Sequence, residues 1–387
     1  MSTRGQPAAS IEFTEEQRLI IDTARDFARR ELEPNVHRWD MEEYFPREAV
    51  MKLGQLGFLG MMIPEEYGGS GLSTLTYVLA LEEISKVDPS IAVTMSVHNS
   101  LPTSMIRDYG SEEQKRKFLV PMARGEKIGA FALSESGAGS DAASLSSTAK
   151  RVEGGYVING TKVFITNGGE GDIFLVFART GEEEGTRGIS CFIVERETQG
   201  FKVGKKERKM GLRASNTTEL IFEDMFVPGF NLLGSPGEGF ILAMKGLDNG
   251  RLGIAAQAIG IAQRCLDESI SYSKERQQFG RPIAEFQAIQ FHIADMATKI
   301  EAARALLHRT AARKDRGDVV TKEASMSKLF ASEVAMETAT KAVQIHGGVG
   351  YMKEFVVERL FRDAKVTELY EGTSEIQRVV IAKRLLK

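Results

Sequence analysis

The chain has few cysteines, histidines and tryptophans, and this shortage excludes some kinds of site. Its 387 residues include two Cys, five His and one Trp. A zinc centre built from thiolates and imidazoles is therefore not expected, and we predict no metal site. Cys191 lies in an apolar strand-like run and Cys265 in an apolar helical run. Both are predicted to be buried thiols, which fits a reducing cytoplasm.

Long apolar runs and an excess of one charge are also missing. No apolar run reaches the roughly 18 residues that a membrane-spanning helix needs. A net charge of -3 gives no cationic field that would attract nucleic acid or an anionic membrane, so neither is expected as a partner. Residues 1–10 contain one arginine and no apolar core, so we predict a short disordered tail and not a targeting signal.

The first third of the chain has the pattern of buried helices. Thr14 and Ser111 each begin a capping box, with Gln three positions later. Between these two boxes, residues 74–86 and 91–109 are apolar enough for buried helices. These features predict a helical domain over residues 11–127.

The pattern changes near residue 128 to short runs that favour strands. Asn159-Gly160 and Asn167-Gly168-Gly169 supply turn residues that are expected to separate these runs. No helical pattern intervenes, so an antiparallel sheet or barrel is predicted over residues 128–238. The strand-like runs are residues 156–158, 173–178, 189–194 and 220–227.

The last third returns to helical periodicity in long segments. Residues 247–278, 284–316 and 321–346 are rich in Ala, Leu and Ile at helical spacing. They predict an antiparallel helical bundle over residues 239–387. The fold class is therefore α+β: a helical domain, a β domain and a four-helix bundle.

Residues 370–377 set a glutamate beside a glycine and a threonine, just before a final helix. Glu371 there could act as a base toward a bound substrate, and the helix N-terminus could hold phosphate. An exposed acidic turn would have the same sequence. This segment alone leaves both interpretations open.

Residues 137–142 match the GxGxxA pattern of dinucleotide-binding folds. That pattern requires a helix directly after the glycines. The Ser- and Thr-rich residues 143–150 lead instead into another strand, which disfavours a nicotinamide site. The alternative is a loop at a strand end whose backbone N–H groups and hydroxyls meet a ligand.

Three further segments could contact a cofactor. The glycines of residues 344–351 would let the backbone approach a pyrophosphate, while Arg276 offers a fork to phosphate and Phe279 a ring face. Arg276 could equally favour only the helix C-terminus. Phe164 could stack on a ring or fill a strand-end core position. His346 is predicted to pack or face solvent, not to catalyse.

Together these segments resemble the signatures of the acyl-CoA dehydrogenase family of flavoenzymes, in order and over nearly the whole chain. Within the family the chain is most similar to short-chain, or butyryl-CoA, dehydrogenases. It departs from the family pattern at Ser136, where proline is usual, and at Phe164, where tryptophan is usual. Gly250 stands where a few relatives place their catalytic carboxylate, so Glu371 has no competitor.

The resemblance implies an FAD enzyme whose catalytic base is Glu371. Expected substrate contacts are Ser140, Asp248, Arg251, Gln257, Thr367 and Gly372; Gln257 and Thr367 match residues that shorten the acyl pocket. Expected FAD contacts are Phe131, Leu133, Ser134, Gly139, Ser140, Phe164, Ile165, Thr166, Arg276, Phe279, Gln287, Gln344, Gly347, Gly348, Thr373 and Glu375.

The implied reaction is the conversion of a short-chain acyl-CoA to the trans-2-enoyl-CoA, as in fatty acid β-oxidation. Glu371 would take the α-proton while hydride passes from the β-carbon to flavin N5. Electron-transferring flavoprotein is the implied acceptor, and a homotetramer built as a dimer of dimers is the implied assembly. Medium-chain, branched or dicarboxylyl substrates, the reverse enoyl-CoA reduction, and flavin monooxygenase or oxidase chemistry remain as alternatives.

Overall fold

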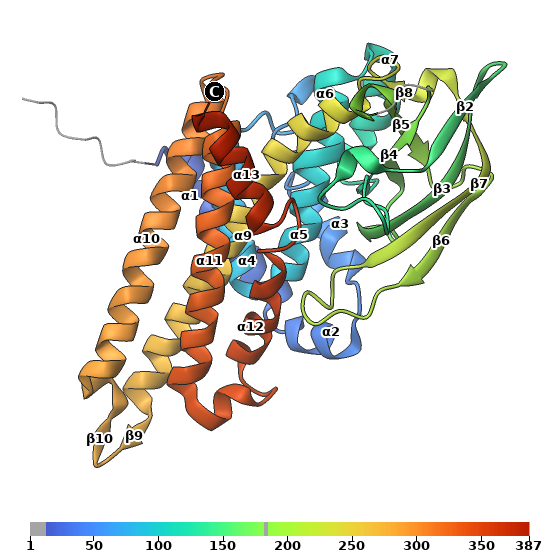
Figure 1. Cartoon of the computed structure of the whole chain (residues 1–387). Coiled ribbons are helices and arrows are strands. Elements are labelled where there is room, and N and C mark those ends of the chain that lie inside the picture. The colour runs from blue at the N-terminus through green and yellow to red at the C-terminus, as the bar shows by residue number, and fades with distance from the viewer. Residues whose placement is uncertain (1–12, 182–184, 387) are drawn as a thin grey trace, which may run out of the picture.

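The computed structural model describes residues 13–181 and 185–386, and it places a twisted sheet beside two groups of helices (Figure 1). The predicted tail at residues 1–10 lies outside the described residues. The α+β class and its helix–sheet–helix order are confirmed. Within the described residues, no helix is long and apolar enough to cross a membrane.

The N-terminal helices bury much of their surface against the C-terminal bundle. The two predicted capping boxes are present, with Thr14 Oγ1 accepting from the Gln17 N–H at 3.1 Å and Ser111 Oγ from Gln114 at 3.2 Å. The α-helices are α1 (Glu15–Phe27), α2 (Val36–Glu42), α3 (Arg47–Gln55), α4 (Thr74–Val87), α5 (Pro89–His98), α6 (Ser104–Tyr109), α7 (Glu112–Gln114) and α8 (Val120–Ala123).

The helix predicted over residues 91–109 is interrupted. A π-helical turn, Asn99–Thr103, joins α5 to α6 and contains Pro102. Proline has no backbone N–H and crowds the preceding turn, so regular i to i−4 bonding cannot continue through it. The apolar pattern located the helix but did not reveal this break.

The middle of the chain forms one eight-stranded sheet in the order β6-β7-β3-β2-β4-β5-β8, with β1 pairing β4. Most pairs are antiparallel as predicted, but β1 and one residue of β2 run parallel to β4. The strands are β1 (Gly129–Ala132), β2 (Thr148–Val152), β3 (Gly155–Thr166), β4 (Ile173–Arg179), β5 (Ile189–Glu195), β6 (Phe201–Lys206), β7 (Thr217–Pro228) and β8 (Leu232–Leu233).

The prediction of a turn at Asn159-Gly160 is wrong. Both residues lie inside β3, at a register shift against β7, where Gly160 has φ 148°. Asn159 Oδ1 accepts from the Asp224 N–H at 2.8 Å, which satisfies that donor across the irregularity. A dipeptide that often makes hairpins here makes a β-bulge.

Long helices form the C-terminal bundle. α9 runs through its centre and packs against α4, α10 and α11, with Leu252 and Ile259 buried. Burying such a side chain contributes about 1.5–3 kcal/mol. The bundle comprises α9 (Gly239–Glu275), α10 (Gln287–Asp315), α11 (Thr321–His346), α12 (Val356–Val366) and α13 (Ser374–Leu385); β9 (Gln277–Gln278) and β10 (Arg281–Pro282) form a hairpin between α9 and α10.

Candidate active site

Two adjoining cavities, of about 260 and 650 Å³, lie where the sheet meets the helical bundle. Three segments border both of them: the loop after β1, the end of β3 and the turn before α13. Eight residues line both cavities, namely Ser134, Gly139, Ser140, Phe164, Thr166, Tyr370, Glu371 and Gly372. Three of the sequence segments that carry the family resemblance, around Ser140, Phe164 and Glu371, therefore converge on one site.

A buried carboxylate holds the loop after β1 in place. Glu135 accepts five hydrogen bonds of 2.6–3.0 Å: the backbone N–H and hydroxyl of both Ser146 and Ser147, and the Lys162 ammonium. Burial raises the pKa of Glu135, but Lys162 and these donors outweigh it and lower the pKa to about 2. Lys162, in β3, also donates to the Leu133 carbonyl at 3.1 Å. Through this one side chain, β3 holds both Leu133 and Glu135 in the loop after β1.

Phe164 reaches the cavities because β3 is irregular at its end. The register against β7 shifts between Lys162 and Ile165, and Phe164 has a left-handed φ of 58°. A bulge of this kind turns a side chain away from the alternation of the strand. Phe164 is consequently 67% exposed and borders both cavities, so it is not a strand-end core residue.

Glu371 lies in a tight turn between α12 and α13. It has φ 53° and is followed by Gly372 at φ 89°, after which Thr373 caps α13 through a 3.4 Å bond from the Ile376 N–H. Glu371 lines both cavities, and its Oε2 is buried without a hydrogen-bond partner among the described residues. Buried carboxylate oxygens are normally paired, so this oxygen is available to a ligand.

Burial raises the pKa of Glu371 to about 7, against the opposing charges of Arg251 and Lys328. A carboxylate with such a pKa is a much stronger base than an exposed one. It is also half ionised near neutral pH, which suits a general base.

Gly250 lies directly against the carboxylate of Glu371. A Cβ at residue 250 would lie 2.7 Å from Glu371 Oε2, inside the contact distance. The next residue, Arg251, lines the cavity and is buried, with Nη1 2.6 Å from Asp248 Oδ1 and its Nε without a partner within the described chain. The site thus has room for one carboxylate, and Gly250 leaves that room to Glu371.

The predicted FAD contacts fall into two groups. Those in or next to β1, at the end of β3 and at the N-cap of α13 line the cavities: Phe131, Leu133, Ser134, Gly139, Ser140, Phe164, Ile165, Thr166 and Thr373. The others lie exposed on the β9–β10 hairpin and at the adjacent ends of α10 and α11, far from the turn before α13 (Figure 1): Arg276, Phe279, Gln287, Gln344, Gly347 and Gly348. Glu375, in the first turn of α13, is exposed and outside both linings.

The residues predicted to shorten the acyl pocket do not line either cavity. Thr367 is buried and donates to the Ala364 carbonyl at 2.7 Å. Gln257 is buried and donates to the Pro89 carbonyl, while its oxygen accepts from the hydroxyl of Tyr370. Gln257 therefore reaches the site through Tyr370, which lines both cavities.

Some residues at the site were not predicted. Lys328, fully buried in α11, donates to the Gly372 carbonyl at 2.8 Å, and Gln377 donates to the same carbonyl at 2.9 Å. Val97 and Leu101 supply apolar wall to the smaller cavity. Lys328 could have been suspected because it shares a helical face with the small residues Ala324 and Ala331.

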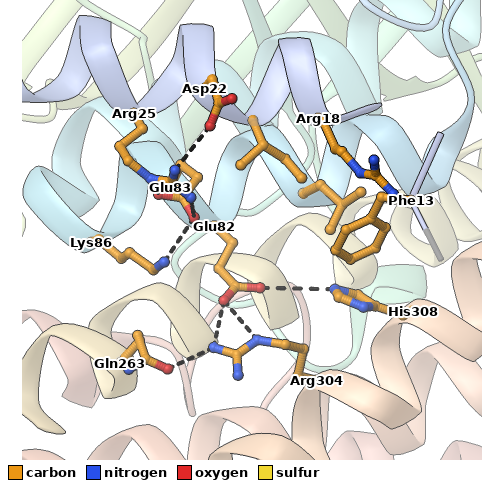
Figure 2. Close-up of a pocket in the computed structure, with 12 residues that line it drawn as sticks. Phe13, Arg18, Asp22, Arg25, Glu82, Glu83, Lys86, Gln263, Arg304 and His308 are labelled. Carbon is orange, nitrogen blue, oxygen red and sulfur yellow. Dashed lines mark hydrogen bonds and ion pairs between the residues drawn. The ribbon is translucent and has the colours of Figure 1, made fainter. Parts of the chain in front are cut away.

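A third cavity, of about 500 Å³, lies between α1, α4, α9 and α10 (Figure 2). Its charged groups pair with one another: Arg304 binds Glu82 at 2.7 Å, and Arg25 and Lys86 bind Glu83 at 3.1 and 2.7 Å. No predicted site residue lines it. These ion pairs connect neighbouring helices. The sequence motifs converge at the other two cavities and not at this one.

The chain belongs to the acyl-CoA dehydrogenase family. It matches the family's N-terminal domain over residues 14–126, its middle domain over 130–225 and its C-terminal domain over 237–386. It is an enzyme of the acyl-CoA dehydrogenase type, similar to relatives named as short-chain enzymes.

Three relatives illustrate the similarity. The short-chain specific acyl-CoA dehydrogenase of Clostridium acetobutylicum is 50% identical over 97% of this chain and 99% of that protein. The acryloyl-CoA reductase (NADH) of Anaerotignum propionicum is 49% identical over 97% of this chain and 95% of that protein. A chain in the structure described as the electron transferring flavoprotein of Acidaminococcus fermentans has 50% identity and a TM-score of 0.97, covering 98% of this chain and all of that one.

The residues present fit the FAD that the family generally binds. The larger cavity combines apolar side chains with hydroxyls and the Lys209 ammonium. A Cβ at Gly139 would meet no atom within 4 Å, so the backbone of this loop is open to close approach by a ligand. The same is true of the exposed Gly347 and Gly348.

Proposed function

We propose that the protein is an FAD-dependent dehydrogenase that converts a short-chain acyl-CoA to its trans-2-enoyl-CoA, with Glu371 as the catalytic base. One observation carries the proposal: Glu371 lines both cavities, its pKa is raised to about 7, and one of its carboxylate oxygens has no hydrogen-bond partner among the described residues. The name of the Clostridium acetobutylicum relative supports the short-chain substrate.

The chain's own residues would bind the thioester and move one proton. Val97 and Leu101 would pack against the acyl chain, and Arg251 and Ser140 would contact the CoA portion. Glu371 would take the α-proton onto its carboxylate. Phe164, Thr166 and the other predicted contacts would hold FAD, which would supply the hydride-accepting chemistry.

Assembly and electron transfer complete the proposal. The predicted contacts at the β9–β10 hairpin are exposed and lie at the opposite end of the bundle from α13 (Figure 1), which supports a dimer at least and the homotetramer expected from the family. Electron-transferring flavoprotein is the proposed acceptor, supported by the described structure that contains a similar chain. The two buried, unpaired cysteines support a place in a reducing cytoplasm.

The test is an anaerobic titration of the FAD-loaded protein with butyryl-, hexanoyl-, octanoyl- and adipyl-CoA, following the flavin absorbance. Strongest bleaching with butyryl-CoA is expected. Bleaching only by a longer or dicarboxylyl thioester would refute the short-chain assignment but keep the reaction. Flavin that none of these thioesters bleaches would refute the proposed reaction.

A second direction has one specific observation in its favour, the similarity to an acryloyl-CoA reductase. The same carboxyl group, protonated, would then return a proton to the α-carbon. Oxidation of the photoreduced enzyme by crotonyl-CoA, compared with its reduction by butyryl-CoA, determines which direction the site favours.

A further inference from the structure

The turn that carries Glu371 has an unfavourable backbone. Glu371 and Gly372 both have positive φ, 53° and 89°. Glycine tolerates this region, but a glutamate there costs free energy and persists only where its surroundings hold it. The surroundings of these two residues should therefore contain the groups that keep the base in position.

Two buried side chains bind the carbonyl groups of this turn. Gln377 Nε2 donates to the Glu371 carbonyl at 3.0 Å and to the Gly372 carbonyl at 2.9 Å. Lys328 Nζ donates to the Gly372 carbonyl at 2.8 Å. Both side chains have no exposed surface, so they hold the turn from α13 and α11 without competition from water.

Lys328 is an unusual choice for this task. A neutral donor would bind the carbonyl equally well, whereas a buried ammonium carries a desolvation cost. Within the described chain, Lys328 forms no ion pair within 4 Å, and its largest electrostatic attraction is to Glu371. Of the carboxylates that interact with its charge, Glu371 has the largest effect.

We propose that Lys328 is a positioning residue that, with Gln377, holds the Glu371–Gly372 turn and whose ammonium also stabilises the ionised carboxylate of Glu371. The first half of the proposal, that Lys328 and Gln377 hold the turn, is supported by the hydrogen bonds alone. The second half, that the ammonium stabilises the ionised carboxylate, rests on the proposed function, because it concerns Glu371 as the base.

Other charges face the same carboxylate and must be considered. Arg251 approaches Glu371 from α9 and favours its ionised form, as Lys328 does from α11. Tyr77 from α4 and the neighbouring Tyr370 interact with Glu371 as neutral phenols. Glu368 and Glu375 also favour the charge of Lys328, more weakly than Glu371 does. Of the two cations, only Lys328 also holds the turn.

The experiment compares Lys328→Met with Gln377→Met. Both substitutions remove donors to the turn at similar side-chain size, but only the first removes a charge. Hydrogen–deuterium exchange of the peptide spanning residues 367–376 reports the hold on the turn and needs no substrate. Stopped-flow reduction of the FAD-loaded enzyme by butyryl-CoA from pH 6 to 9 reports the ionisation of Glu371.

We expect faster exchange in both variants and a change in the pH profile of only one. Removing an opposite charge raises a carboxyl pKa by about one unit or more, so the rise in rate of Lys328→Met should move to higher pH. At pH 7 the higher pKa of Glu371 alone lowers the rate about fivefold. At pH 9 the carboxyl is ionised in both proteins, so this part of the loss disappears. Gln377→Met should reduce the rate at every pH without moving the midpoint.

Three results would overturn the proposal or its parts. Unchanged exchange in Lys328→Met would refute the hold on the turn. An unmoved pH midpoint in Lys328→Met would refute the effect of its charge. If the wild-type flavin is not reduced by any acyl-CoA, the proposed function fails while the exchange result still decides the first half. If Lys328→Met does not fold, Lys328→Gln, which keeps a polar group in the buried site, replaces it.

Discussion

Replacing Glu371 with glutamine should stabilise the protein, and more so as the pH rises. The reason is the buried carboxyl, whose pKa is raised from 4.5 to about 7 by burial in spite of Arg251 and Lys328. Glutamine has nearly the same shape and cannot ionise. The substitution therefore removes a charge that the folded protein accommodates poorly.

The size and sign follow from proton linkage. Between pH 4.5 and 7 the unfolded chain releases the proton of Glu371 while the folded protein keeps it, so wild-type stability falls through this window and the loss is complete above it. Each pKa unit corresponds to 1.36 kcal/mol. The advantage of Glu371→Gln should thus grow from about 1 kcal/mol at pH 5 to about 3 kcal/mol at pH 8.

The measurement is thermal unfolding of the FAD-loaded protein at several pH values, with FAD in constant excess so that its own contribution cancels. For a chain of this length, 3 kcal/mol corresponds to a rise in Tm of about 4 °C. Glu197→Gln, an exposed carboxyl on a turn, is the matched control and should change Tm little at any pH. A Glu371→Gln variant that is no more stable than wild type at pH 8 would refute the assigned burial cost.

Three other substitutions test separate parts of the site. Gly250→Ala places a Cβ 2.7 Å from the carboxylate of Glu371 and should slow flavin reduction at least tenfold while FAD stays bound; an unchanged rate would contradict the tight packing. Lys162→Met removes the cation that pairs with the buried Glu135 carboxylate and should lower the free energy of unfolding, measured with denaturant, by about 3–5 kcal/mol. The same change at Lys202, which forms an exposed pair, should lower it by less than about 1 kcal/mol. Equal losses in the two variants would contradict the structural role of the buried pair. Phe279→Ala removes a ring that is 92% exposed, so it should leave the secondary structure by circular dichroism intact yet weaken FAD retention in equilibrium dialysis; unaltered retention would exclude Phe279 as a contact.

Sequence patterns could predict the order of the regions and most of the residues around the smaller cavity. Capping boxes at Thr14 and Ser111 predicted helix starts because the two hydrogen bonds involved are local. The motifs around Ser140, Phe164 and Glu371 predicted a common site because all three resemble one family, and the structure brings them together.

Sequence patterns could not predict the features that depend on tertiary contacts. Asn159-Gly160 has turn chemistry, but β7 pairs across it and makes a bulge. Gln257 matches a pocket-shortening residue, yet its amide is bound to Pro89 and Tyr370 away from the cavities. Lys328 carries no motif, because its role depends on a carbonyl 44 positions later in the chain. In each case the deciding partner is distant in sequence.

Two glutamates at this site show how environment assigns different tasks to the same side chain. Glu135 accepts five hydrogen bonds, and its pKa is lowered to about 2, so it stays ionised and cannot take up a proton near neutral pH. Glu371 has an oxygen without a partner among the described residues, and its pKa is about 7. Environments that shift the pKa values of two carboxyl groups in opposite directions give one group a structural role and the other a chemical role. One carboxylate therefore joins the loop before β2 to β3, while the other keeps a pKa that suits the proposed proton transfer.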